Sequence, residues 1–365
     1  MFKTVEKIRI AIFDKIVGQM AVSPDQRAVF EYDAYWLKNG FSISPFYLPL
    51  KPDVFIAKQS PFNGLFGVFN DSLPDGWGNL LIDRLLLKHG TNPQSLSVID
   101  RLSIVGKSGM GALCYEPDNS FKTVSDKTEL NFFAVEIVKI IKEQESDFLE
   151  LLVDKNGSSG GARPKVLISI DKEDWIVKFP LSFDPSDIGE IEYHYSLIAK
   201  KCGVEMPETR LFENKYFGVK RFDKHQNMRF HVHSVAGLLY ADYRLPSLDY
   251  TELIKAAWAL TQNMEEVKKV FRLMVFNVLT GNKDDHAKNF SFIFTNNQWK
   301  FAPAYDLTPS YGINDNHSTT IMGQGNPTKT DIMEVSKQAG IKEKTAREIF
   351  EEVYENCAEI RVADF

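Results

Sequence analysis

The hydrophobic pattern changes along this chain, from short alternating segments near its start to long helical stretches near its end. Residues 8–13 and 28–32 follow the two-residue period of half-buried strands, and residues 79–89 follow a helical period. Residues 264–280 also repeat apolar side chains at helical spacing, as does most of the chain beyond about residue 250. The pattern predicts an α+β protein with a small, mainly β module first and a mostly helical lobe last.

The middle of the chain mixes both periods. A glycine-rich segment at residues 156–165 precedes two strand-like runs, 166–170 and 175–179, which predict a hairpin. A helix is expected at residues 188–202. We therefore expect three parts: an N-terminal module at 1–115, a middle part at 130–235 and a helical lobe at 236–365.

Charge and cysteine content limit the possible settings of the protein. The formal net charge of -6 argues against a globally basic nucleic-acid binder. Three widely separated cysteines, Cys114, Cys202 and Cys357, favour neither a disulfide framework nor a zinc site. No apolar run approaches the length of a membrane span, so a cytoplasmic protein without a membrane partner is expected.

Residues 281–289 form the densest polar loop, between an apolar helix and a predicted hairpin. A turn centred between Asn297 and Gln298 would place Asn289 opposite Asp306, and directly paired side chains lie about 5 Å apart. An amide oxygen and a carboxylate at this distance could share Mg²⁺, with Asp284 nearby as a base for phosphoryl transfer from ATP. The alternative is an ordinary turn with capping residues.

Two further segments could hold the nucleotide. Backbone amides of Gly160 and Gly161 could approach phosphate oxygens, with charge from Arg163 or Lys165, although a flexible linker explains the same composition. Lys178 lies within an apolar strand, where a carboxylate such as Glu192 could hold it toward ATP. Solvated charges at the ends of elements are the alternative.

Residues 219–223 end a strand before a polar turn. Backbone groups there could bind adenine, and Asp223 could reach the ribose, although an ordinary strand-end turn fits equally well. His231 and His233 have no third ligand nearby in the sequence, so a metal role is not expected.

Together these residues resemble the HipA-type toxin kinases. The resemblance spans about residues 10–340 and is carried by Asn-x-Asp-x-His-x-Lys-Asn at 282–289, Tyr305-Asp306, and segments 71–76, 175–180 and 219–223. It implies a bilobed, protein-kinase-like fold and an ATP- and Mg²⁺-dependent serine/threonine protein kinase. Such a toxin arrests growth by phosphorylating a cellular protein such as an aminoacyl-tRNA synthetase. The implied partner is a small helix-turn-helix antitoxin like HipB, through which alone DNA would be contacted.

The resemblance also implies residue roles by position. Asp284 is the expected general base, supported by His286 and Lys288, and Asn289 and Asp306 are the expected Mg²⁺ ligands. Autophosphorylation is expected at Ser158, seven residues before Lys165, or at the adjacent Ser159. The expected nucleotide-binding residues are Gly160, Gly161, Ala162, Arg163, Lys165, Lys178, Glu192, Arg221, Phe222 and Asp223.

The chain departs from the family pattern at Arg163, where many relatives have glutamine, and its C-terminal lobe is shorter than in the longest members. Two rival functions remain open. A kinase of similar fold could phosphorylate a small molecule with the same site chemistry. A catalytically silent binding module could keep the fold, but the intact Asp284, Asn289, Lys178 and Asp306 argue against it.

Overall fold

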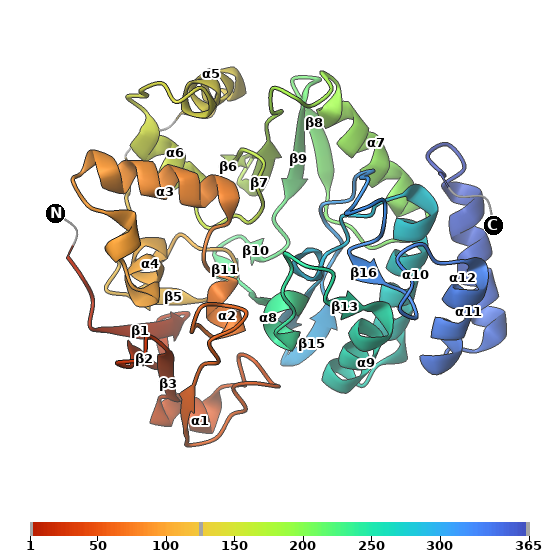
Figure 1. Cartoon of the computed structure of the whole chain (residues 1–365), viewed down its shortest axis with the longest axis horizontal. Helices are drawn as coiled ribbons and strands as arrows, with labels where there is room; N and C mark the ends of the chain where they lie inside the picture. The colour runs from red at the N-terminus through yellow and green to blue at the C-terminus, as the bar shows by residue number, and fades with distance from the viewer. Residues whose placement is uncertain (1–2, 124–126, 363–365) are drawn as a thin grey trace. The chain divides into compact units, whose positions relative to one another are not determined.

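The computed structural model describes residues 3–123 and 127–362, which form two compact units (Figure 1). The first contains residues 1–189 and 212–231, and the second contains residues 190–211 and 232–365. Within the described ranges, no helix combines the length and apolar composition that a membrane span requires. The predicted mixture of helices and strands, with a largely helical C-terminal region, is confirmed.

The first unit begins with a five-stranded antiparallel sheet in the order β4-β3-β2-β1-β5. Its strands alternate in burial, since Ile8 and Ile10 are buried whereas Lys7 and Arg9 are exposed. Helix α4 packs on this sheet. The elements of this part are β1 (Lys7–Ile12), β2 (Lys15–Val22), β3 (Ala28–Tyr32), α1 (Ala34–Asn39), β4 (Val54–Ile56), α2 (Gly67–Asn70), η1 (Pro93–Ser95), α4 (Val98–Val105) and β5 (Cys114–Glu116).

Three helices pack around a second sheet of the first unit, whose strands β6, β7 and β9 pair in that order. Trp77, Phe133 and Trp175 join helices and sheet in one core. The predicted hairpin at residues 166–179 is confirmed as β6 and β7. The elements are α3 (Gly76–Lys88), α5 (Leu130–Ile141), α6 (Leu149–Asn156), β6 (Lys165–Ile170), β7 (Glu173–Lys178), β9 (Tyr216–Lys220), β10 (Lys224–His225) and β11 (Met228–Arg229).

The second unit is mainly helical and is built around α10 (Met264–Thr280), which packs against α9, α12 and β15. Its remaining elements are α8 (Val235–Leu239), β13 (Leu248–Asp249), α9 (Tyr250–Thr261), η2 (Ala287–Asn289), β14 (Ser291–Thr295), β15 (Gln298–Phe301), β16 (Thr319–Thr320), α11 (Lys329–Gln338) and α12 (Glu343–Asn356). Helix α7 (Ile188–Lys201) and strands β8 (Thr209–Phe212) and β12 (His231–Ser234) lie where the chain passes from one unit to the other.

Every residue in the C-terminal half of helix α10, 273–280, is buried, whereas Lys268, Lys269 and Arg272 in its first half are partly exposed. A helical segment that is buried on all sides lies inside a core rather than on a surface. It begins where the side chain of Asn263 accepts the amide of Glu265, and it ends at Gly281, whose left-handed backbone (φ 66°) suits glycine. The polar loop predicted to carry the chemistry therefore leaves the end of the most buried helix of this unit.

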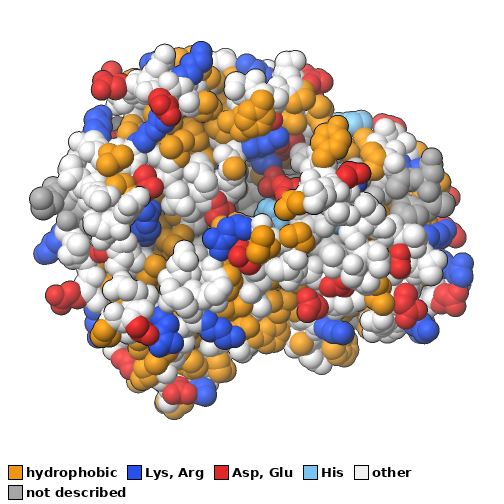
Figure 2. All heavy atoms as spheres, viewed as in Figure 1, with side chains coloured by type: hydrophobic (Ala, Val, Ile, Leu, Met, Phe, Trp, Pro, Cys, Tyr) orange, Lys and Arg blue, Asp and Glu red, His pale blue; other side chains and the backbone are white. Residues whose placement is uncertain are grey.

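The surface carries both signs of charge. On the face drawn in Figure 2, the Lys and Arg side chains of the described residues are interspersed with Asp and Glu, and hydrophobic side chains reach the surface between them. The arrangement on this face agrees with the mixed composition and small negative net charge of the chain.

Candidate functional site

Asp284 lies in the loop that follows α10, and its side chain is 62% exposed. Its amide donates to Ser310 Oγ (2.7 Å), and its carboxylate lies 3.9 Å from His286 Nε2. His286 caps the short helix η2, because its Nδ1 accepts the amide of Lys288 (3.2 Å). The loop therefore holds its backbone in place and leaves the Asp284 carboxylate accessible, as a general base requires.

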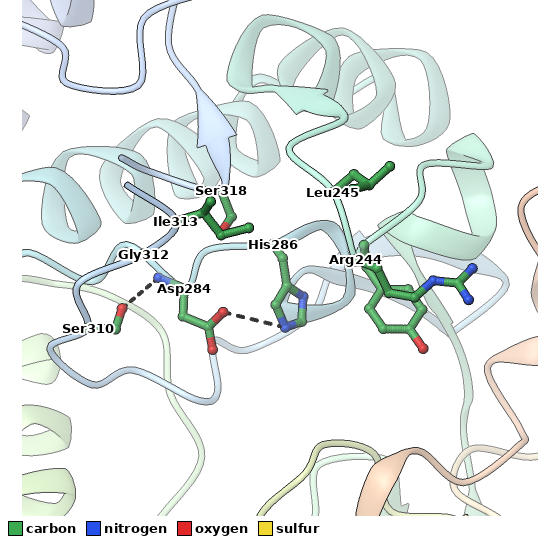
Figure 3. A pocket seen from close by; sticks show the side chains of 9 residues that line it. Arg244, Leu245, Asp284, His286, Ser310, Gly312, Ile313 and Ser318 are labelled. Atoms are coloured by element: carbon green, nitrogen blue, oxygen red, sulfur yellow. Dashed lines mark hydrogen bonds and ion pairs between the residues drawn. The ribbon is translucent and has the colours of Figure 1, made fainter. Parts of the chain in front are cut away.

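Asp284 and His286 also line a cavity of about 340 Å³ in the second unit. Figure 3 shows their side chains next to each other, with residues from two other loops around them. Tyr243 from one of these loops packs against His286 at a tilt of 48°, with ring centroids 5.9 Å apart, and Lys288 Nζ lies 4.6 Å from the centroid of the Tyr243 ring. The three residues predicted for catalysis, Asp284, His286 and Lys288, are thus brought together.

The predicted metal ligands come from the two sides of the hairpin β14–β15. The side-chain nitrogen of Asn289 donates to the carbonyl of Asp284 (2.7 Å). Tyr305 Oη donates to the carbonyl of Lys288 (2.8 Å) and hydrogen-bonds Ser291 Oγ (2.6 Å). Tyr305 thereby fastens the segment that precedes Asp306 to the segment that carries Asn289.

The predicted register of this hairpin is wrong. Thr295 pairs with Gln298, so the turn is centred between Asn296 and Asn297, and pairing extends only to Phe292 and Phe301. Asn289 therefore does not lie opposite position 306. Asn296 and Asn297 have φ of 50° and 59°, which is the two-residue turn with two positive φ angles that asparagine tolerates and strand twist favours.

A buried hydrogen-bond network around Asp285, which was not predicted from the sequence, anchors the loop that carries Asp284. Asp285 is 1% exposed and accepts hydrogen bonds from Tyr250 Oη (2.9 Å) and the amide of Thr319 (3.2 Å). His317 Nδ1 lies 3.0 Å from the same carboxylate. Asn277 of α10 donates to Tyr250 Oη (2.9 Å), which ties the network to the central helix.

Burial and the neighbouring Asp285 charge raise the pKa of Tyr250 well above its usual value, so its hydroxyl remains a donor. One signal in the sequence points to this network. Successive side chains of an extended loop point to opposite sides, so of two adjacent aspartates, Asp284 and Asp285, one is expected to face inward.

The glycine-rich loop lies between α6 and β6 in the first unit. The Gly161 amide donates to Asp75 Oδ2 (3.0 Å) just before α3, and Lys165 Nζ donates to the carbonyl of Gly160. Arg163 pairs with Asp184 (3.0 Å), and Ala162 lies beside Gly76. The predicted loop residues are thus gathered in one folded segment, and their contact with phosphate stays a prediction.

Ser158 and Ser159 are both buried at the start of this loop, 2% and 3% exposed. Ser158 Oγ accepts the amide of Met110 (2.8 Å), and Ser159 Oγ donates to the carbonyl of Asn156 (2.9 Å). In the folded loop neither hydroxyl is open to a phosphate donor, so modification requires the loop to leave this position.

Lys178 ends β7, and its backbone pairs with Lys165 of β6. Its Nζ lies 5.6 Å from the centroid of the Phe217 ring. Glu192 is buried in α7, in the second unit. The pairing of Lys178 with Glu192 stays a prediction.

Arg221 and Asp223 form a buried ion pair at the end of β9, flanking the half-buried Phe222. Arg221 donates from Nε to Asp223 Oδ1 (2.9 Å) and from Nη2 to Oδ2 (2.6 Å), and the Gly111 amide also donates to Oδ2 (2.7 Å). Burial alone would raise the pKa of Asp223, but the Arg221 guanidinium and these hydrogen bonds outweigh burial and lower it. Binding of ribose by Asp223 stays a prediction that would require these bonds to rearrange.

His231 Nε2 lies 2.8 Å from the carbonyl oxygen of Ile43. Among residues 3–123 and 127–362, no group of three or more His, Cys, Asp and Glu side chains is arranged to hold a metal ion. Binding of Mg²⁺ by Asn289 and Asp306 stays a prediction.

The chain is similar in sequence to two bacterial proteins over most of its length. Two proteins of Sinorhizobium fredii (strain NBRC 101917 / NGR234), both named as candidate kinases, match most of it. Y4dM is 22% identical over 390 residues, covering 94% of this chain and 89% of its own, and Y4mE is 26% identical over 350 residues, covering 86% and 79%.

A solved chain from the Shewanella oneidensis MR-1 complex of the toxin–antitoxin proteins HipA and HipB with operator DNA has the same fold. It superposes with a TM-score of 0.69 at 19% identity and covers 97% of this chain and 90% of that chain. The family model of the HipA N-terminal domain matches residues 8–116, and that of the HipA-like C-terminal domain matches residues 157–360, more than half of the chain. This protein therefore belongs to the HipA family.

Proposed function

We propose that this protein is an ATP- and Mg²⁺-dependent kinase that phosphorylates a serine or threonine hydroxyl of a cellular protein. The observation that carries the proposal is the Asp284 loop. An exposed carboxylate lies on a backbone fixed by Ser310, and the same loop carries Asn289, joined by Tyr305 to the segment that leads to Asp306. This is the set that phosphoryl transfer requires: a base for the hydroxyl and oxygen ligands for the cation.

In the proposed reaction, the acceptor hydroxyl lies at the Asp284 carboxylate. Its oxygen forms a bond to the γ-phosphorus of ATP while the bond from that phosphorus to the bridging oxygen of ADP breaks. The hydroxyl proton passes to Asp284 Oδ. His286, 3.9 Å from this carboxylate, keeps it oriented, because its ring is held by the Lys288 amide and by Tyr243.

Asn289 and Asp306 would hold Mg²⁺, since an amide oxygen and a carboxylate are ligands that this cation prefers. The bound cation would neutralise charge on the phosphates. Lys165, Lys178 and the backbone of residues 160–163 are proposed to bind the phosphates, and Glu192 to orient Lys178. The end of β9, residues 221–223, is proposed to border the adenosine.

Ser158, or the adjacent Ser159, is proposed as a site of autophosphorylation. A phosphate adds nearly two negative charges to a hydroxyl that is 2% exposed in the folded loop. The modified loop could not return to that position, because a doubly charged group would have to be buried there, and the kinase would be switched off.

We further propose that the protein is the toxin of a toxin–antitoxin pair with a HipB-like antitoxin, through which it would contact DNA. Support comes from family membership and from the composition of the Shewanella complex. An aminoacyl-tRNA synthetase is the proposed class of target, from the resemblance alone. A small-molecule kinase and a silent binding module remain the rivals.

The experiment is mass spectrometry after incubation of the full chain with ATP and Mg²⁺. Wild type is compared with Asp284→Asn, which keeps the shape and removes the base, and with Glu355→Gln, which neutralises an exposed acid of α12. Phosphate should appear on the wild type and on Glu355→Gln, mapped to Ser158 or Ser159, and should vanish in Asp284→Asn. If phosphate persists in Asp284→Asn, the proposed base is wrong.

If no variant gains phosphate, a bacterial lysate treated with phosphatase is added as substrate. Phosphoserine or phosphothreonine that depends on Asp284 would support a protein kinase without a self-limiting loop. No phosphate on any protein, together with no binding of ATP by calorimetry, would overturn the kinase proposal.

A further inference from the structure

The cavity beside Asp284 is bordered by hydrophobic side chains that the fold leaves exposed. Leu245 and Ile313 line it and are 62% and 53% exposed, and Tyr311, next to the lining residue Gly312, is 87% exposed. Figure 3 shows Leu245 and Ile313 on the same side of the Asp284 and His286 pair, although they come from loops 68 positions apart. Exposed apolar groups gathered at a cavity, rather than scattered singly, mark a binding surface.

The loop that carries Ile313 is fastened to the catalytic loop at Lys283 and at the peptide between Lys283 and Asp284. Ser310 Oγ accepts the Asp284 amide (2.7 Å), and the Ser318 amide donates to the carbonyl of Lys283 (3.0 Å). Lys283 Nζ also donates to the carbonyl of Asp315 (2.7 Å). These bonds hold Ile313 at a set position relative to the Asp284 carboxylate.

Local backbone geometry keeps this loop tight. Gly312 has a φ of 62°, and a side chain there would meet the carbonyl of Asn316 at 2.0 Å, so only glycine fits. The Asn316 amide donates to the carbonyl of Ile313 (3.1 Å), which closes a turn through Asn314 and Asp315. The closed turn therefore holds Ile313 with its side chain exposed rather than packed in the core.

The loop that carries Leu245 is fixed in the same way. The Leu245 amide donates to the carbonyl of Asp242 (3.1 Å), and Arg244 Nε donates to the Asp242 carboxylate (2.8 Å). Tyr243 packs against His286 and Lys288 of the catalytic loop. Two fastened apolar side chains therefore share one cavity with the proposed base.

We propose that this cavity binds a large apolar side chain of the protein substrate, two residues from the serine or threonine that is phosphorylated. The inference rests on the proposed kinase function. The acceptor hydroxyl must reach Asp284, and the cavity is at the small end of ligand pockets, about 300–1,000 Å³. In an extended segment, side chains two positions apart point to the same side, so the acceptor and this neighbour enter the cavity together.

The test is phosphorylation of a degenerate peptide library with a fixed central serine or threonine, by the full chain with ATP and Mg²⁺. Leu, Ile, Met or Phe should be enriched two positions before or after the acceptor. A peptide with leucine there should have kcat/KM roughly 10- to 100-fold above its glycine counterpart, the range expected for burial of one such side chain. Enrichment only at adjacent positions, or no enrichment, would overturn the proposal.

Leu245→Asp should bring the ratio of kcat/KM between the leucine and glycine peptides close to one, and Ile313→Asp is a second variant if the first fails to fold. Leu87→Asp, at an equally exposed leucine of α3, should keep the wild-type ratio. A ratio unchanged in Leu245→Asp and Ile313→Asp would overturn the proposal. If no peptide is phosphorylated while phosphate that depends on Asp284 appears on the chain or on lysate proteins, this inference fails and the kinase proposal stands; if neither appears, both fail.

Discussion

Removing one partner of the buried ion pair between Arg221 and Asp223 is expected to destabilise the first unit strongly, and this loss tests whether Asp223 is structural. In Asp223→Leu, the Arg221 guanidinium, 9% exposed, loses both of its hydrogen bonds to the carboxylate, and the Gly111 amide loses its acceptor. Breaking a buried pair by removing one partner costs about 3–5 kcal/mol, because the remaining charge is buried without compensation.

The double variant Arg221→Met, Asp223→Leu should be less destabilised than either single variant. Both charges are then gone, and the main remaining loss is the unsatisfied Gly111 amide, about 1–3 kcal/mol. Free energies of unfolding are measured with urea, and hydrogen exchange of the Gly111 segment reports the local effect. A double variant as unstable as the sum of the two single variants would refute the coupling between them.

The same pair predicts a pH dependence with a definite sign. The pKa of Asp223 is lowered in the folded state, so its contribution to stability is present above the unfolded value, about 3.9, and is lost as the pH falls through the folded value. The wild type should therefore lose stability below about pH 4, and Asp223→Leu should lose less over that interval. If Asp223→Leu instead keeps full stability and loses ATP affinity by calorimetry, Asp223 is a nucleotide ligand.

Two further substitutions test the loops of the second unit. Tyr250→Phe removes the hydroxyl that joins Asn277 to Asp285 and should cost about 1–3 kcal/mol of unfolding free energy, measured with urea; a change below about 0.5 kcal/mol would show that the network is not stabilising. Asn297→Val places a β-branched residue at a φ of 59° and should cost about 1–2 kcal/mol, whereas Asn297→Gly should not, so equal unfolding midpoints of the two variants would contradict the turn assignment.

Elements with a strong period could be predicted from the sequence because their signal is local. The long apolar helix was expected at residues 264–280 and spans Met264–Thr280, and the hairpin at residues 166–179 pairs as β6 and β7. Helix α6 (Leu149–Asn156) was not predicted, since eight residues give too little periodicity to distinguish it from a loop. Its burial against α3 and β6 is a tertiary effect that the local sequence does not contain.

The turn of the hairpin β14–β15 shows a different limit. Four polar residues, 295–298, allow several turn centres, and a shift of one position changes which residues face each other across the strands. The turn that forms has Asn296 and Asn297 at its centre, both at positive φ. Asparagine tolerates this backbone conformation, and the preference decides where the turn lies. The prediction that Asn289 and Asp306 are neighbours therefore depends on the hydrogen bond from Tyr305 Oη to the carbonyl of Lys288, and not on strand pairing.

The sequence predicted the exposed part of the candidate site but not the buried network that supports it, and Asp284 and Asp285 show why. Asp284 belongs to a recognisable motif, whereas the partners of Asp285 are Tyr250, His317 and Thr319, which no spacing along the chain connects. An exposed polar loop with few buried contacts opens easily, and catalytic groups need positions held to a fraction of an ångström. The inward aspartate supplies buried contacts directly beside the outward one. We infer that the loop tolerates an exposed carboxylate at Asp284 because its neighbour is anchored to α9 and, through Asn277, to α10.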